Sequence, residues 1–229
     1  METKQVYLRE LKIFETLNNS QIEQFSSASG LKIATRNDVI TYGVGGLHKI
    51  FILLKGKIKI VALDSDGNTQ TKEIIHHGDF FGYLDLVEQD DLNEQAIVVS
   101  DSVIIVSFLQ RDFENLIRLY PEIALRYTKY IGKKMGNLKI RYEKLIFSNA
   151  RSRLLQFFMD WAAQEGKVEG NTITLENYLT QNDIAQIINT SRPTTVALMR
   201  ELGENGIVYY SRRKIIIENI KNALHPMAS

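Results

Sequence analysis

The 229-residue chain has no cysteine and only three prolines, and none of its apolar runs is long. Without a thiol it forms no disulfide, no thiolate metal site, no cysteine-ligated iron–sulfur cluster and no cysteine nucleophile. A membrane helix needs roughly 18 to 20 apolar residues, and a signal peptide needs an apolar core near its start. The sequence shows neither pattern, so we expect a cytoplasmic protein that makes no membrane contact.

The chain also lacks a large net charge, because its 28 Lys and Arg residues are balanced by 27 acidic residues. The chain has no basic tail, and any basic surface must be local. Catalytic patterns are missing too: there are no paired carboxylates with a shared pocket signature and no metal-spaced cluster, and Gly43-Val44-Gly45-Gly46 lacks the Lys-Ser/Thr of a phosphate-binding loop. The sequence predicts one large or two modest domains and no enzyme.

The segment from Leu179 to Leu202 has the pattern of two short helices joined by a polar turn. Thr180 can cap the first helix, with Asp183 three residues later at its positive end. Ser191 can cap the second helix, and Pro193 falls in its first turn, where the missing N–H costs nothing. This pattern predicts a helix-turn-helix.

The second helix would place two arginines, Arg192 and Arg200, on its outer face. An arginine can donate two parallel hydrogen bonds to guanine in the major groove, and short hydroxyls suit phosphate. The alternative is an ordinary helical hairpin with solvated arginines. Arg151 and Arg153, which open an earlier helix, are further candidates for phosphate contact. The candidate DNA-binding residues are Thr180, Ser191, Arg192, Thr194, Arg200 and Arg213.

A strand, a basic turn and a second strand follow this pair of helices, over residues 207–210, 211–213 and 214–217. Residues 190–214 carry five Lys and Arg against two acids. Phosphate neutralisation by such groups supplies most of the affinity in DNA complexes. The sequence therefore predicts a winged helix-turn-helix that binds DNA, in preference to a plain hairpin.

The first half of the chain is rich in short strands separated by polar turns. Asp66-Gly67-Asn68 is typical of a hairpin turn. Several strands at this spacing predict a β-sandwich or jelly roll. The predicted strands cover residues 38–41, 49–54, 57–63, 71–75, 96–99 and 103–108.

A long helix is predicted after Pro121, with apolar residues that alternate four- and three-residue steps. Such a seam buries itself against a second copy of the chain, which indicates a homodimer. The alternative is a helix that packs on its own domain. The expected dimer interface consists of Ile131, Met135, Leu138, Tyr142 and Leu145.

The order of these segments resembles the CRP/FNR family of bacterial transcription regulators. The resemblance rests on Phe51–Ile58, on Gly78–Leu84, on the long helix and on Thr190–Thr194, and it covers about residues 30–219. It implies an α+β fold: a cyclic-nucleotide-binding-like β jelly roll sensor at 1–118, a long dimerisation helix at 119–147 and a C-terminal winged helix-turn-helix at 148–229. The implied partners are double-stranded DNA with a palindromic operator, a second copy of the chain, and RNA polymerase.

The chain departs from the cyclic-AMP-binding branch of this family at every polar ligand contact. Gly82-Tyr83-Leu84 stands in place of Gly-Glu-Leu, Glu94-Gln95 in place of Arg-Ser, and Leu138-Lys139 in place of Thr-Ser. Between residues 79 and 110 there are seven acids and no Lys or Arg, which would repel a phosphate. We expect an effector other than cyclic AMP, or none. The candidate effector-pocket residues are Gly82, Tyr83, Leu84, Gln95 and Leu138.

His76 and His77 invite interpretation as haem ligands, as in the family's carbon-monoxide sensor. Adjacent histidines at a strand end point in different directions and are more often turn residues. Since cysteine is absent as well, we expect neither haem nor an iron–sulfur cluster as a cofactor. The alternative function is a ligand-binding signalling module that acts through protein contacts without DNA.

Overall fold

A computed structural model describes residues 2–44, 47–84 and 93–218 of the chain. The chain divides into two compact units, Met1–Gly136 and Asn137–Ser229, and the boundary between them falls inside one long helix. Among the described residues, no helix is both long enough and apolar enough to cross a membrane.

The first unit begins with three short helices, α1 (Glu2–Glu10), η1 (Lys12–Phe14) and α2 (Asn19–Ser27). Asn18 and Gln21 form a capping box at the start of α2, in which each side chain accepts a hydrogen bond from the other residue's backbone N–H. Two further helices follow the strands, α3 (Gln110–Leu119) and α4 (Pro121–Phe147).

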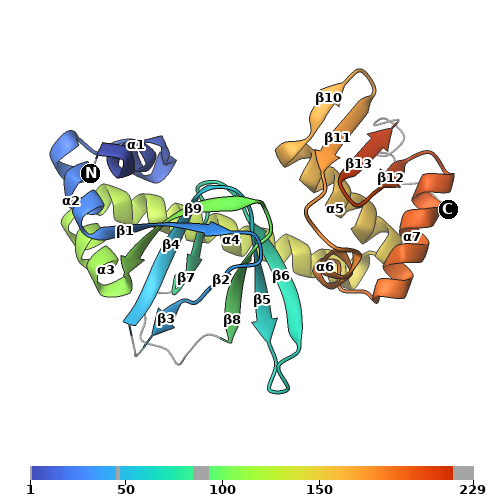
Figure 1. Ribbon diagram of the computed structural model, residues 1–229, viewed down its shortest axis with the longest axis horizontal. Coiled ribbons are helices and arrows are strands. Elements are labelled where there is room, and N and C mark those ends of the chain that lie inside the picture. The colour runs from blue at the N-terminus through green and yellow to red at the C-terminus, as the bar shows by residue number, and fades with distance from the viewer. Residues whose placement is uncertain (1, 45–46, 85–92, 219–229) are drawn as a thin grey trace. The chain divides into compact units, whose positions relative to one another are not determined.

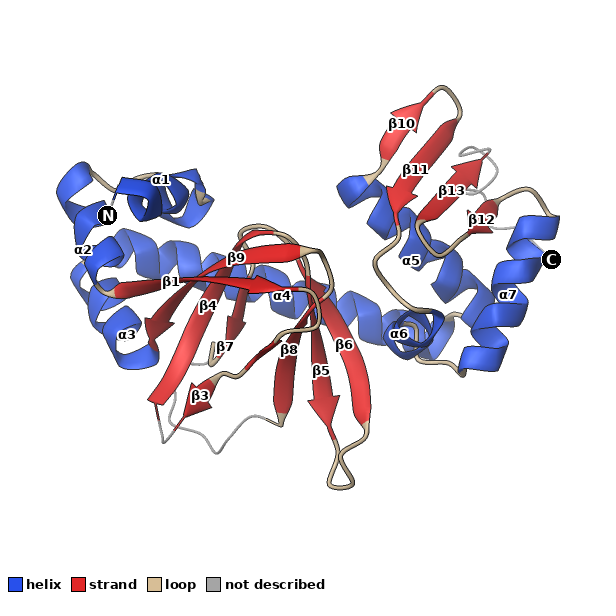
Figure 2. Cartoon of the chain, viewed as in Figure 1, coloured by secondary structure: helices blue, strands red, loops and turns tan. Residues whose placement is uncertain are grey.

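The strands form two antiparallel sheets, which confirms the predicted jelly roll (Figure 2). In the first sheet the order is β1 (Ser29–Thr35), β9 (Ser102–Leu109), β4 (Leu47–Lys55) and β3 (Gly43–Val44), and β7 (Phe80–Gly82) also pairs with β4. In the second sheet the order is β2 (Val39–Ile40), β8 (Glu94–Val98), β5 (Ile58–Leu63) and β6 (Thr69–Ile75).

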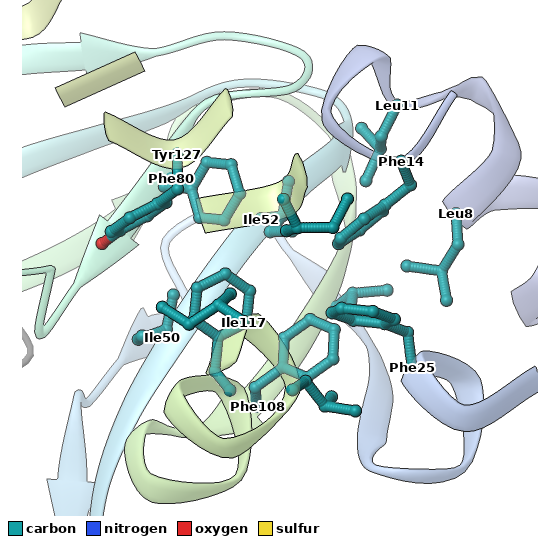
Figure 3. Packing of buried hydrophobic residues seen from close by; sticks show 14 of the residues in the cluster. Leu8, Leu11, Phe14, Phe25, Ile50, Ile52, Phe80, Phe108, Ile117 and Tyr127 are labelled. Atoms are coloured by element: carbon teal, nitrogen blue, oxygen red, sulfur yellow. The ribbon is translucent and has the colours of Figure 1, made fainter. Parts of the chain in front are cut away.

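Strand β4 is buried on both of its faces, which explains its continuous apolar sequence. Phe51 and Leu53 join the core between the two sheets, whereas Ile50 and Ile52 join a second core. Figure 3 shows this second core, where side chains of the N-terminal helices meet those of the sheet and of α3 and α4. The sheet is therefore covered by helices on one face and by the other sheet on the opposite face.

The first part of α4 is tied to β7 by tyrosine hydroxyls. The backbone N–H of Phe80 donates to Tyr130 Oη (2.8 Å), and Tyr130 Oη donates to the carbonyl of Phe80 (3.2 Å). Tyr127 Oη donates to the carbonyl of Leu84 at 2.5 Å. Gly82, at the end of β7, has a φ of +92°, and a Cβ there would lie 2.5 Å from the carbonyl oxygen of Lys49. Only glycine lets β7 pass this close to β4.

The second unit contains the end of α4, α5 (Ala150–Glu165), α6 (Gln181–Ile187) and α7 (Arg192–Glu204) (Figure 1). Its four-stranded sheet has the order β10 (Lys167–Glu169), β11 (Thr172–Glu176), β13 (Lys214–Glu218) and β12 (Val208–Tyr210). The predicted winged helix-turn-helix is confirmed. The strands β10 and β11, which extend the wing hairpin β12–β13 into a full sheet, are not among the predicted elements.

Candidate nucleic-acid interface

Helix α6 begins at the predicted cap. Thr180 Oγ1 accepts a hydrogen bond from the backbone N–H of Asp183 (3.1 Å). Asp183 Oδ2 in turn accepts from the backbone N–H (3.0 Å) and the hydroxyl (2.7 Å) of Thr180. After α6 the chain reverses at Asn189, whose φ of +53° lies in the left-handed region that asparagine tolerates. The cap and the turn fix where the second helix starts.

Helix α7 presents the two faces expected from its sequence. Ser191 Oγ accepts from the backbone N–H of Thr194 (3.2 Å), so the capped end of α7 lies beside Arg192. Arg200, two turns later, pairs its Nε with Glu204 Oε1 at 2.8 Å. The inward-facing residues are Thr195, Met199 and Leu202, which are buried, and Leu198, which is half-buried. The outward-facing residues are Arg192, Pro193, Val196, Ala197 and Arg200, all exposed.

The wing turn connects β12 to β13 and is closed by one serine. Ser211 donates from its backbone N–H (2.9 Å) and from its hydroxyl (2.7 Å) to the carbonyl of Lys214. The backbone N–H of Lys214 donates back to Ser211 Oγ at 3.1 Å. Arg212 and Arg213 lie at the tip of this turn, and both are exposed. The turn thus presents two cations to solvent.

Arg151 and Arg153, the further candidates for phosphate contact, both have partners inside the second unit. Arg151 Nε pairs with Glu201 Oε1 on α7 at 2.7 Å. Arg153 donates to three carbonyls: Ile188 (2.9 Å) and Asn189 (3.3 Å), which follow α6, and Ser148, which follows α4. A cation is favourable at these helix ends because their carbonyls lack partners within the helix. Arg153 therefore holds the turn that leads into α7.

The structure also shows a buried polar side chain that sequence reasoning missed. Asn177, in the loop between β11 and α6, is buried and donates from its side chain to the carbonyl of Ser211 in the wing. An asparagine just before a capped helix is ordinary loop composition, so nothing in the local sequence marks it.

The effector-pocket candidates are divided between the two units. Gly82, Tyr83 and Leu84 follow one another at the end of β7, and Gln95 is half-buried on β8. The ring of Tyr83 is buried and stacked on His48, with the ring centroids 3.8 Å apart. Leu138 lies in the second unit, where it is exposed.

Two acidic side chains of the second sheet, Glu94 and Glu73, are each paired with a lysine. Glu94, at the position of the family's arginine, pairs with Lys72, and Glu73 pairs with Lys134 of α4 at 3.2 Å. Burial, reinforced by the charges of Glu94 and Glu73, raises the pKa of Tyr42, so its hydroxyl stays protonated. That hydroxyl has no hydrogen-bond partner among the residues that the structure describes.

The two adjacent histidines make separate contacts. His77 Nδ1 lies 2.7 Å from the carbonyl oxygen of Leu54, and His76 Nδ1 lies 3.1 Å from Lys57 Nζ. Within the described ranges, no group of three or more His, Cys, Asp or Glu side chains could hold a metal ion.

The predicted seam on α4 is largely bare in the single chain. Met135, Leu138 and Tyr142 are 67%, 65% and 63% exposed. Ile131 and Leu145, at the two ends of the seam, are half-buried. Three large apolar side chains at helical spacing are thus exposed to solvent.

Comparisons with known proteins agree with this architecture. Residues 35–120 match the cyclic nucleotide-binding domain, and residues 152–222 match the Crp-like helix-turn-helix domain. The chain is 21% identical to the cAMP-activated global transcriptional regulator CRP of Pasteurella multocida, over 73% of this chain and 80% of the relative. It is 23% identical to a CRP-like cAMP-activated global transcriptional regulator of Mycobacterium tuberculosis, over 75% of this chain and 76% of the relative. These relatives are transcription regulators and not enzymes.

Solved structures share the whole fold. A CooA mutant from Carboxydothermus hydrogenoformans has a TM-score of 0.72 at 18% identity and covers 93% of each chain. A CRP/FNR-family transcriptional regulator from Thermus thermophilus has a TM-score of 0.69 at 20% identity, over 85% of this chain and 96% of the other.

The carbonyl contacts of Arg153 make a prediction about stability. Arg153→Gln should lower the free energy of unfolding of the second unit by about 1–3 kcal/mol, since a charged donor is lost to three carbonyls. Arg200→Gln is the matched control: it removes an exposed i,i+4 ion pair and should cost about 0.5 kcal/mol or less. Urea unfolding followed by the fluorescence of Trp161, the one tryptophan, reports on this unit. Equal losses in both variants would contradict the assigned role of Arg153.

Proposed function

This chain belongs to the CRP/FNR family of transcription regulators, and from that premise we propose that it binds a palindromic DNA operator as a homodimer and contacts RNA polymerase from that site. The observation that carries the proposal is the exposure of three arginines, one at the amino end of α7 and two at the wing tip. We propose further that the chain works in the cytoplasm and divides, as its relatives suggest, into a sensor at 1–118, a dimerisation helix at 119–147 and a DNA-binding domain at 148–229.

We assign base reading to Arg192. Its side chain is exposed at the amino end of α7, and the first turn of a recognition helix is the part that contacts base edges. Arg200 lies two turns away and is already paired with Glu204, so phosphate is the more suitable partner for it. Ser191 and Thr194 are hydroxyl groups at the start of α7, where phosphate oxygens are bound well. Thr180 is exposed at the start of α6, but its hydroxyl donates to Asp183, so a phosphate contact of Thr180 would have to replace that bond.

The wing supplies affinity without sequence preference. Arg213 is exposed at the wing tip, and a cation on a turn reaches the phosphate backbone more readily than a base edge. Release of counterions by each such contact makes binding depend on salt. Arg213 and Arg192 should therefore affect binding in different ways.

Dimerisation through α4 follows from its bare seam. Three large apolar side chains recurring on one helix face are costly in water and pack well against a second copy. Isologous symmetry fits a palindromic site, and the resemblance to helix-turn-helix dimers implies that the two α7 helices lie about one turn of DNA (~34 Å) apart. The operator should accordingly contain two inverted half-sites.

We propose that the effector is not cyclic AMP. In the relatives' cyclic-AMP-binding branch an arginine holds the phosphate, whereas here Glu94 takes that position and is paired with Lys72. Tyr83, in place of the ribose-binding glutamate, is buried against His48. The remaining acids would repel a phosphate, so a neutral or apolar effector fits the charge of this region better.

The roles of Arg192 and Arg213 are separable by substitution. Arg192→Ala should cost about 1–3 kcal/mol on the cognate site and relax the preference at one base pair. Arg213→Ala should weaken binding to all sequences alike and flatten the salt dependence by about one unit of slope. Selection of sites from random DNA with both variants measures this. If Arg192→Ala selects the wild-type motif with undiminished sharpness, Arg192 does not read a base, and if the wild type binds no DNA, a module acting through protein contacts is favoured instead.

The seam predicts that Leu138→Glu breaks the dimer. Two carboxylates would be buried against each other at the symmetry axis, which should cost several kcal/mol. Ile140→Glu is the matched control, because Ile140 is also exposed but lies on the opposite face of α4. Analytical ultracentrifugation at micromolar concentration should show a monomer for Leu138→Glu and a dimer for Ile140→Glu and the wild type. A dimer in all three samples means that the seam is assigned wrongly.

Isothermal titration with cyclic AMP tests the proposed effector class. The wild-type protein should give no saturable heat, because Glu94 and its acidic neighbours repel the phosphate. A cAMP-activated relative titrated in parallel serves as the positive control. Tight, saturable binding of cyclic AMP by this chain would refute the charge argument.

A further inference from the structure

One buried amide joins the wing to the start of the helix-turn-helix. The side chain of Asn177 donates from Nδ2 to the carbonyl of Ser211 (2.7 Å) and accepts at Oδ1 from the backbone N–H of Leu179 (3.1 Å). Its own backbone N–H donates to the carbonyl of Arg213 at 3.0 Å. Asn177 therefore contacts both sides of the wing turn, and it also contacts the residue that precedes the cap of α6.

The chemistry of this position suits asparagine alone. One end of the side chain must donate and the other must accept, so an aspartate would set a carboxylate oxygen against the carbonyl of Ser211. A leucine of similar size would leave both partners without a hydrogen bond. Because Asn177 is 8% exposed, water cannot easily replace either bond.

Tyr210 makes a second tie at the same place. Its Oη donates to the carbonyl of Leu179 at 3.0 Å, and burial raises the pKa of this hydroxyl, which keeps it protonated and able to donate. The backbone of Leu179 is thus hydrogen-bonded at its N–H to Asn177 and at its carbonyl to Tyr210. Directly after it comes Thr180, the cap of α6.

We propose that Asn177 is a positioning residue that fixes the wing arginines relative to α6, so that both bind the DNA backbone in one pose. The proposal rests on the DNA-binding function stated above. Without the amide, the wing tip is free to move relative to the helix-turn-helix, and Arg212 and Arg213 lose their phosphate contacts although their side chains are intact. Asn177 itself touches no DNA.

A thermodynamic cycle between Asn177→Ala and Arg213→Ala tests this role. Alanine adds no charge, so any change in the salt dependence reports a lost phosphate contact. The probe is a fluorescein-labelled DNA duplex of random sequence, titrated by anisotropy over a range of KCl concentrations with the full-length chain. Asn205→Ala is the matched control, since Asn205 is exposed at the opposite end of α7 from Arg192.

We expect Asn177→Ala to flatten the salt dependence by about two units, one for each wing arginine, whereas Arg213→Ala alone flattens it by about one unit and weakens binding roughly tenfold near 0.1 M salt. The double variant should match Asn177→Ala within about twofold, because the contact is already lost. Asn205→Ala should behave as the wild type. If Asn177→Ala lowers the melting temperature strongly, Tyr210→Phe replaces it, since that change removes the bond to Leu179 but keeps the bond between Asn177 and Ser211, and it should also reduce the cost of Arg213→Ala.

Three results would overturn the proposal. An unchanged salt slope in Asn177→Ala, or an Arg213→Ala cost that is the same in both backgrounds, shows that Asn177 does not position the wing while DNA binding itself stands. A wild-type chain that gives no salt-dependent binding overturns the proposed function and this inference together.

Discussion

Backbone groups at helix ends need hydrogen-bond partners, and the second unit is built around the side chains that supply them. Asn149, Thr180 and Ser191 cap the amino ends of α5, α6 and α7. At the carboxyl ends, the guanidinium of Arg153 donates hydrogen bonds to the two carbonyls that follow α6 and to the carbonyl of Ser148, which follows α4. The angle at which α7 leaves the turn therefore depends on a small set of polar contacts as well as on the apolar core. A surface meant to fit the groove of DNA gains from this arrangement, because capped ends allow little variation in where each helix starts.

Much of this could be predicted from the sequence, and the reason is local. Thr180 with Asp183, and Ser191 with Pro193, are strong signals because the cap and the helix that it starts lie within four residues of each other. The strands of the jelly roll are likewise visible as short apolar runs between turns. Strand alternation likewise predicts that one of the adjacent residues Tyr209 and Tyr210 faces inward, and in the structure Tyr209 is exposed whereas Tyr210 is bonded to the carbonyl of Leu179.

What escaped prediction depends on contacts between distant parts of the chain. Strand β1 and the short strand β7 are specified by pairing with β9 and β4, strand β11 by pairing with β13, and strand β10 by pairing with β11. The structural role of Arg153 was not predicted, because sequence shows its charge and not its three carbonyl partners. Asn177 acts on residues 34 positions away, and no local pattern reports such a contact.

Strand β7 links the two cores of the first unit. Its alternation sends Phe80 into the core beneath the helices and Phe81 into the core between the sheets, where Phe81 stacks on Phe51. The backbone of Phe80 is bonded on both its N–H and its carbonyl to Tyr130 of α4. Phe80 and Phe81 are adjacent in the chain, so a displacement of the Phe81 ring would also move the backbone of Phe80. Either Tyr130 would then move with Phe80, or its two hydrogen bonds would be strained. Through Phe80 and Phe81, strand β7 therefore connects packing between the two sheets to the position of α4.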